Sequence, residues 1–305
     1  MAKIVFSYDC ESKWGMLDHL GGLSQSHFNH KVITQTYSAL YELHERHDVS
    51  ATFAFVGGFT LPCDIFSKFA AKNIVPGGHL EEWIANIGIN EVGFDENEWC
   101  YPTLIRRLQR HEFNFEIATH GFTHAILSQC TNEELQFEAN GIALWAQYHD
   151  IDVSTIIFPR NEVNSKLFEY ARFLRAYRAA PENIFKGKLG SQIYRLLKEL
   201  HLSPRCGKVE RLESDILSIS GDFFINWRHG IRGLIPMGIT FHRAKKIIDD
   251  AIEKDGVVNF WLHPHNLITG DKQFELLELI VEYVSRLQKN GKILSYTQRD
   301  LLQNC

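Results

Sequence analysis

The sequence lacks any apolar run of about 20 residues, the length that a helix needs to span a bilayer, so we expect no membrane insertion. Its first residues also lack the charged segment, apolar stretch and cleavage site of a secretory signal. Positive charge is not in excess either, because 32 Lys and Arg stand against 37 Asp and Glu, which gives a net charge of −5. We therefore expect no nucleic-acid partner and no basic face for an anionic membrane.

Two common short motifs are missing as well. No Cys-x-x-Cys pair occurs among the six cysteines, which are Cys10, Cys63, Cys100, Cys130, Cys206 and Cys305. In a chain of this size without a signal, we expect them to be reduced thiols and the protein to be cytoplasmic. No Gly-x-Gly-x-x-Gly follows the first predicted strand, which argues against a dinucleotide-binding protein.

Short apolar runs alternate with longer helical patterns along the whole chain, and no repeat or Pro/Ser-rich linker divides it. The predicted strands are Lys3–Tyr8, Ala51–Val56, Glu116–Ala118, Thr155–Phe158, Arg175–Ala179, Leu217–Ser220, Val257–Leu262 and Ile293–Ser295. The predicted helices are Thr34–His47, Tyr101–His111, Asn132–His149, Ser165–Phe173, Phe241–Lys254 and Lys272–Asn290. Strands that are apolar on both faces and are followed by helices indicate parallel βα units. About seven such units predict one α/β domain over residues 1–305, a distorted (β/α)7-type barrel.

Residues 57–99 interrupt this alternation. The segment holds two prolines, several glycines and two tryptophans, and few of its positions follow a helical period. A long connection of this composition is typical of a lid or a substrate wall inserted into the barrel. An excursion that only packs its own aromatic residues is the alternative, and the sequence leaves both open.

Two carboxylates, Asp9 and Glu11, follow the first predicted strand. In an extended backbone, residues two apart point to the same face. Carboxylates held together in this way repel each other unless a cation lies between them or one stays protonated. The pair is thus a candidate for metal binding or proton transfer, and a solvated acidic loop is the alternative.

Three more polar groups stand after predicted strands, where functional residues of a barrel gather. His120 and His124 are four residues apart, so a helical turn would place both imidazoles on one side, as two nitrogen ligands of one metal ion. Arg160 follows the strand that ends at Phe158 and is suited to a bidentate pair with a carboxylate. His263 leaves the strand Val257–Leu262 and is a candidate general acid. Each of these residues alone is also compatible with an ordinary structural role, and the two histidines alone are better explained as unrelated residues.

The order of these groups resembles that of the polysaccharide deacetylase (NodB-homology) family, which includes carbohydrate esterase family 4. Ser7–Glu11 stands in the place of the family's Thr-Phe-Asp-Asp-Gly motif, and His120–His124 is similar to its His-Ser/Thr-x-x-His motif. Phe158–Asn161 replaces its Arg-x-Pro segment, and Leu262–His265 is similar to its Leu-x-His motif. The similarity spans positions 6 to 265.

The resemblance implies a metal-dependent hydrolase of linear amide bonds. It implies that Glu11, His120 and His124 hold one divalent ion, with Zn²⁺ favoured. Asp9 would take a proton from the attacking water, oriented and kept ionised by Arg160, and His263 would protonate the departing amine. Cys10 occupies the position of the family's second Asp, so a Cys10 thiolate is a competing ligand.

The substrate implied is an N-acylated amino sugar or glycan precursor, either free or nucleotide-linked, that carries an acetyl or formyl group. A cytoplasmic protein would not reach cell-wall polymers, so a precursor of O-antigen type fits better. Two alternatives stay open, a metal-independent hydrolase of cyclic amides such as allantoin and a non-catalytic glycan-binding barrel. The oligomeric state is left open.

Overall fold

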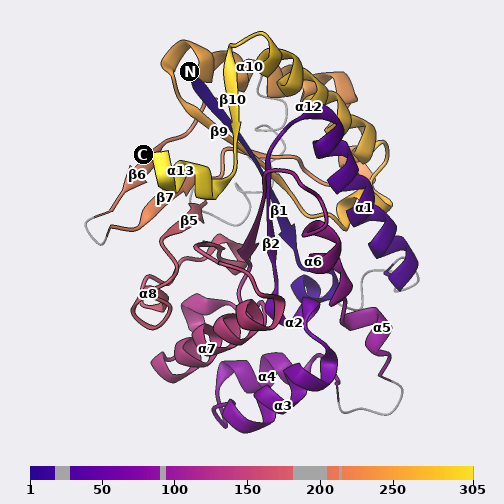
Figure 1. The fold of residues 1–305 in the computed structure, drawn as a ribbon. Helices are drawn as coiled ribbons and strands as arrows, with labels where there is room; N and C mark the ends of the chain where they lie inside the picture. The colour runs from indigo at the N-terminus through magenta and orange to yellow at the C-terminus, as the bar shows by residue number, and fades with distance from the viewer. Residues whose placement is uncertain (18–27, 90–93, 181–204, 213–214, 305) are drawn as a thin grey trace.

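The computed structural model describes residues 1–17, 28–89, 94–180, 205–212 and 215–304 (Figure 1). Ten strands within these ranges form a single sheet. They are β1 (Ala2–Cys10), β2 (Ala51–Phe55), β3 (Phe115–Thr119), β4 (Thr155–Ile157), β5 (Ala176–Ala179), β6 (Val209–Arg211), β7 (Leu217–Ser220), β8 (Phe223–Phe224), β9 (Val257–Leu262) and β10 (Ile293–Tyr296).

The strand order is β6-β7-β5-β4-β3-β2-β1-β9-β8, and β10 pairs with β1 outside this path. Within the described part of the chain every strand pair is parallel except β6–β7. The sheet curls, because an antiparallel bridge joins Gly207, just before β6, to Val257 at the start of β9. The predicted α/β class and distorted barrel are confirmed.

Strand β1 lies at the centre of this arrangement. Its first half pairs with β10, its second half pairs with β2, and most of its length pairs with β9. Eight of its nine residues are buried. A strand covered on both faces needs apolar residues at consecutive positions, which explains the unbroken run Ile4–Phe6. Because the neighbouring strands are parallel to β1, their carboxyl ends open on the same side as Asp9.

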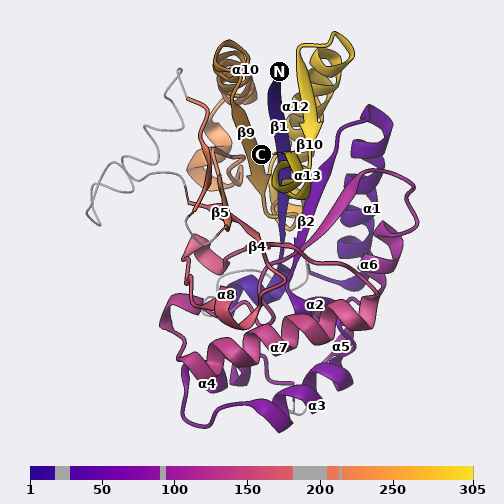
Figure 2. The ribbon, with the colours of Figure 1, turned by 60° about the vertical axis from the view of Figure 1, so that its left-hand side comes forward.

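Helices cover the outside of the curled sheet (Figures 1 and 2). They are α1 (His30–His47), α2 (Gly57–Thr60), α3 (Cys63–Asn73), α4 (His79–Ala85), α5 (Glu96–Trp99), α6 (Thr103–Leu108), α7 (Asn132–His149), α8 (Leu167–Tyr170), α10 (Met237–Lys254), α11 (Asn266–Thr269), α12 (Gln273–Lys289) and α13 (Gln298–Asn304). Helices α3, α4 and α7 lie together at the lower end in both views. A capping box of Thr131 and Glu134 starts α7, and Asp150 in the left-handed conformation ends it, which explains why its predicted bounds are correct.

Residues 57–99 differ from the sequence-based expectation of an irregular connection. They contain helices α2 to α5, of which α3 spans 11 residues. The apolar positions of α3 that reach the core are few, namely Cys63, Phe66 and Ala70. Three buried positions are too few to give a visible helical period in the sequence, and the prolines and glycines on either side indicate a loop instead.

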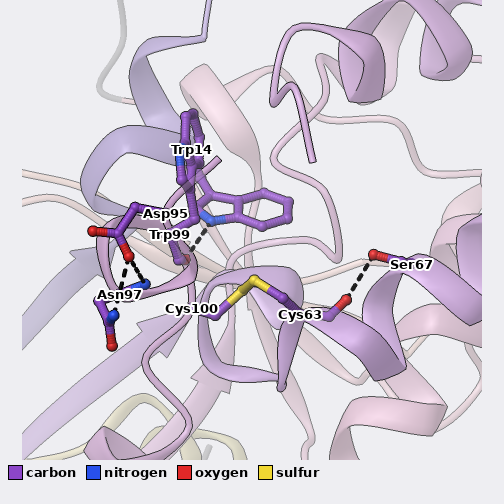
Figure 3. The surroundings of a disulfide bond; sticks show 7 residues. All are labelled: Trp14, Cys63, Ser67, Asp95, Asn97, Trp99 and Cys100. Carbon is purple, nitrogen blue, oxygen red and sulfur yellow. Dashed lines mark hydrogen bonds between the residues drawn. A yellow bond between two sulfur atoms is a disulfide. The ribbon is translucent and has the colours of Figure 1, made fainter. Parts of the chain in front are cut away.

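A disulfide bond joins Cys63 and Cys100, whose Cα atoms are 5.8 Å apart (Figure 3). It ties the start of α3 to the residue that follows α5. The adjacent Trp99 carbonyl accepts a hydrogen bond of 2.9 Å from Trp14 Nε1. The prediction of six reduced thiols is therefore wrong at Cys63 and Cys100, and with it the argument from thiols for a cytoplasmic location loses its support. Among the described cysteines, Cys10, Cys130 and Cys206 are free.

No helix within the described ranges combines the length and the apolar character required to cross a membrane.

The disulfide is expected to stabilise the protein, because it closes a loop across a sequence separation of 37 residues. Cys63→Ser or Cys100→Ser should lower the free energy of unfolding by about 2–4 kcal/mol, measured by urea denaturation under oxidising conditions. Cys130→Ser is the control and should unfold like the wild type. Equal stability of the wild type with and without a reductant would contradict the bond.

Candidate metal centre and proton-transfer groups

The end of β1 presents two acidic side chains to the interior of the curled sheet. Asp9 and Glu11 are 2% and 5% exposed, and both approach the same atom, His263 Nε2, at 3.7 Å and 3.6 Å. Cys10, between them, points the other way, and its Sγ donates a hydrogen bond to the Tyr8 carbonyl. The alternation expected from an extended backbone thus separates the carboxylates from the thiol.

The Glu11 carboxylate meets the two histidines that follow β3. Its Oε2 is 3.1 Å from His120 Nε2 and 2.6 Å from His124 Nε2. A helical turn does not bring the imidazoles together, which corrects the sequence-based expectation. Instead, Gly121 with φ 80° and His124 with φ 64° reverse the chain, and a left-handed backbone at the non-glycine His124 is a strained conformation typical of functional sites.

The protonation of His120 is set by its surroundings. Its Nδ1 is 2.7 Å from the Ile157 carbonyl, which can only accept, so Nδ1 carries a proton and Nε2 is the nitrogen that faces Glu11. Burial lowers the pKa of His120, but the hydrogen bond to the Glu11 carboxylate and the charges of Asp9 and Glu11 raise it overall, so a bound cation would take the place of the Nε2 proton. Buried His124 has its Nε2 2.6 Å from Glu11 Oε2, and no partner for its Nδ1 is found among the described residues. Burial lowers the pKa of His124, which favours the neutral imidazole that a metal ion needs as a ligand.

The three side chains fit a divalent metal ion. One ligand atom from each of Glu11, His120 and His124 lies within 4.8 Å of the others. Gly15 leaves room for the carboxylate, because a Cβ at this position would lie 2.2 Å from Glu11 Cδ. Two imidazole nitrogens and one carboxylate are a donor set typical of zinc with open coordination positions.

A second group of possible ligands, Glu11, His263 and His265, shares Glu11 with the first and belongs to the same site. His263 remains 24% exposed, whereas burial lowers the pKa of His265 to about 4. The two rings stack with their centroids 5.2 Å apart. The place of His265 at the site was not predicted from the sequence, although the alternation in His263-Pro264-His265 was a signal for it.

Asp9 forms an ion pair with a residue that the sequence analysis did not select. The Arg178 guanidinium donates to both carboxylate oxygens, at 2.6 Å and 2.7 Å. Its remaining N–H groups donate to Ser7 Oγ and Asn161 Oδ1, and its face lies 4.1 Å from the ring centroid of Trp261. Arg178 is fully buried, and all of its donors have acceptors.

The bidentate pair expected of Arg160 is therefore made by Arg178 on β5. Arg160 follows Pro159 at the end of β4 with φ 57°, and its side chain is exposed. Asn161, also in the left-handed region at φ 56°, turns its side chain toward Arg178 instead. A signal for this arrangement was present, because an arginine inside a barrel strand is buried only if a carboxylate pairs with it.

Burial raises the pKa of Asp9, but the Arg178 charge beside it has the opposite effect, helped by His120 and His263, and the net pKa is lowered. Burial likewise raises the pKa of Glu11, yet His263 and His124 bring it well below its usual range. Both carboxylates are thus ionised at neutral pH. The Arg178 guanidinium pairs with Asp9, so the negative charge of Glu11, beside the imidazoles, attracts a further cation.

The Cys10 thiolate is not supported as an alternative ligand. Burial raises the pKa of Cys10 well above that of an ordinary thiol, and its side chain packs in the core on the opposite face of β1. Within the described chain, neither group of possible metal ligands includes it.

Residues 57–99 contact the loop that carries the histidines. Trp83 of α4 donates from Nε1 to the Thr123 carbonyl at 3.0 Å, and its ring centroid lies 6.4 Å from that of His124. On the other side of the site, Phe224 and Trp261 stack with their centroids 4.1 Å apart, and both rings stand edge-on to His263. Aromatic walls therefore flank the candidate ligands.

Comparison with solved structures identifies this arrangement of strands and helices. A protein from Mycobacterium smegmatis described as a polysaccharide deacetylase superposes with a TM-score of 0.62 at 11% identity, covering 99% of this chain and 89% of that one. The fold is that of the polysaccharide deacetylases. A protein from Pseudomonas aeruginosa PAO1 with the same description gives a TM-score of 0.58 at 11% identity, covering 99% of this chain and 90% of the other.

An allantoinase shares the polysaccharide deacetylase fold as well, with a TM-score of 0.57 at 10% identity over 99% of this chain and 89% of that one. No protein-family model matches the sequence, and no curated protein matches it either. The likeness of this chain to these proteins is thus one of fold.

The assignment of the ion pair to Arg178 can be tested by stability. Arg178→Met leaves the buried Asp9 charge unpaired and should lower the free energy of unfolding by about 3–5 kcal/mol. The double variant Asp9→Asn/Arg178→Met should recover much of this loss. Arg160→Met, at an exposed position, should change it by no more than about 0.5 kcal/mol. Urea denaturation measures all three, and the reverse ranking of the two arginines would refute the assignment.

Proposed function

We propose that the protein is a metal-dependent hydrolase that removes an N-acyl group, acetyl or formyl, from an amino sugar or glycan precursor. The observation that carries this proposal is the meeting of Glu11, His120 and His124 beside an ionised Asp9, with His263 against both carboxylates. The deacetylase fold supports it, because the candidate residues stand at the strand ends where barrel enzymes place their chemistry.

Glu11, His120 and His124 would hold one divalent ion, of which Zn²⁺ is the best match to their donor atoms. When bound, such an ion supplies Lewis-acid polarisation of the acyl carbonyl and makes water easier to deprotonate. The Ile157 carbonyl holds the Nδ1 proton of His120, so Nε2 is the nitrogen that would coordinate, and it would release the proton it shares with Glu11 as the metal binds.

Asp9 is proposed as the general base. Its carboxylate is ionised, and the bidentate contact with Arg178 fixes its orientation. A carboxylate held in this way accepts a proton from the attacking water at a defined position. The positive charge of Arg178 then favours loss of that proton, which restores the ionised Asp9 carboxylate.

His263 is proposed as the general acid. It is exposed enough to meet a substrate, and its Nε2 faces the two carboxylates. An amine is a poor leaving group unless it is protonated as the C–N bond breaks, and an imidazolium at this position supplies that proton.

The amino sugar would lie between the aromatic walls of the site. Phe224 and Trp261 stand beside His263, and half-buried Trp227 is held by a hydrogen bond from its Nε1 to Thr269 Oγ1. Aromatic faces suit the apolar face of a sugar ring. On the opposite side we propose that residues 57–99 serve as a fixed substrate wall, because Trp83 is hydrogen-bonded to the histidine loop.

The function is tested with a panel of free and UDP-linked N-acetyl and N-formyl amino sugars, with allantoin included, under Zn²⁺, Co²⁺ and Mn²⁺. We expect release of acetate or formate that chelation abolishes and added metal restores. His120→Ala/His124→Ala should lose both turnover and bound metal, whereas His242→Ala, an exposed control, should keep both. Metal-independent opening of allantoin, or sugar binding without turnover, would each replace the proposal with another function.

The role of Asp9 has its own test. Asp9→Asn should keep stoichiometric metal in elemental analysis, while kcat falls by about 10²–10⁴, the usual contribution of a general base. Turnover of the variant close to that of the wild type would show that another group accepts the proton.

A further inference from the structure

The segment between the two histidine ligands is short and has an unusual backbone. Only Gly121, Phe122 and Thr123 separate His120 from His124, and the chain enters the left-handed region at both Gly121 and His124. A loop of this kind forms no regular backbone ladder, so its amide and carbonyl groups need partners from elsewhere.

The carbonyl groups of this loop are bound by the neighbouring segment. Gly57 N–H donates to the Gly121 carbonyl at 3.0 Å, and Gly58 N–H donates to the Phe122 carbonyl at 2.8 Å. The Thr123 carbonyl accepts from the Trp83 indole. The amide groups of Phe122 and Thr123 point the other way, toward α7.

A single carboxylate on α7 accepts from these amides. Glu138 Oε2 accepts from Phe122 N–H at 2.7 Å, and Glu138 Oε1 accepts from Thr123 N–H at 3.1 Å. Thr123 Oγ1 also donates to Glu138 Oε1, and it accepts in turn from the Ala125 amide at 3.2 Å. Glu138 is fully buried.

Retaining a carboxylate in such a place is costly, and burial raises the pKa of Glu138 to about 7. An apolar side chain would avoid that cost but would leave the amides of Phe122 and Thr123 buried without acceptors. The loop has little room to move and find other acceptors, because the Phe122 ring packs against Phe66 and Gly141. The contact with Gly141 is so close that a Cβ at that position would lie 2.3 Å from the Phe122 ring.

We propose that Glu138 is a positioning residue of the metal centre, whose carboxylate holds the loop 120–124 so that both imidazoles face Glu11 before the metal binds. The proposal rests on the metal-dependent function proposed above. Outer groups that orient metal ligands commonly change metal affinity 10–100-fold when they are removed.

Glu134, one helical turn earlier on α7, is a matched control. It is equally buried and also accepts two backbone N–H groups, both at 2.8 Å, but these belong to Leu80 and Thr131. A variant of Glu134 therefore removes the same kind of side chain from the same helix without touching the histidine loop.

The experiment compares Glu138→Ala, Glu138→Gln and Glu134→Gln with the wild type in two measurements. In the metal-free proteins, hydrogen exchange of the Phe122 and Thr123 amides should be faster in Glu138→Ala and unchanged in Glu134→Gln. In calorimetric titrations, Glu138→Ala should bind Zn²⁺ about 10–100-fold more weakly. Glu138→Gln, which keeps one acceptor oxygen, should recover part of this loss, and it also serves if Glu138→Ala does not fold.

Unchanged exchange and wild-type Zn²⁺ affinity in the Glu138 variants would overturn the proposal, as would an equal loss of affinity in Glu134→Gln. Failure of the proposed function has a different signature. A wild-type protein that binds no Zn²⁺ would refute that function, while the exchange comparison in the metal-free proteins would still decide whether Glu138 holds the loop.

Discussion

The site depends on the burial of two negative charges at the end of one strand. Asp9 and Glu11 are both shielded from water, and an isolated carboxylate in such surroundings is costly. Asp9 is compensated by a buried guanidinium that lies across the sheet interior. Among the described residues, imidazoles lie beside Glu11, so a cation joining them would complete its compensation. This difference supports the proposal that the first carboxylate transfers protons and the second binds a metal.

Much of the fold followed from local patterns in the sequence. All eight predicted strands are present, because buried parallel strands give apolar runs with helices between them. Strands β6 and β8, with three and two residues, were missed, since no period is visible at that length. The disulfide bond between Cys63 and Cys100 was not predicted either, because a disulfide depends on the distance between two Cα atoms, which only the folded chain defines.

The candidate site was predictable in its composition more than in its connections. Asp9 and Glu11 on one face follow from the pleat of a strand, and the spacing of His120 and His124 indicated a shared role. The helical turn expected there was wrong, because Gly121 changes the path of the chain. The partner of Asp9 lies 169 residues away, and Glu138 acts through backbone amides. Neither contact leaves a local pattern in the sequence.

The position of Arg178 on β5 has a consequence for how such barrels are compared. Strands β4 and β5 are neighbours in the sheet, and Asn161, just after β4, accepts from the guanidinium that β5 supplies to Asp9. The positive charge therefore reaches Asp9 from one strand later than the order of the motifs predicts. Two barrels of this kind are then better compared by which groups meet in space than by the order of their motifs.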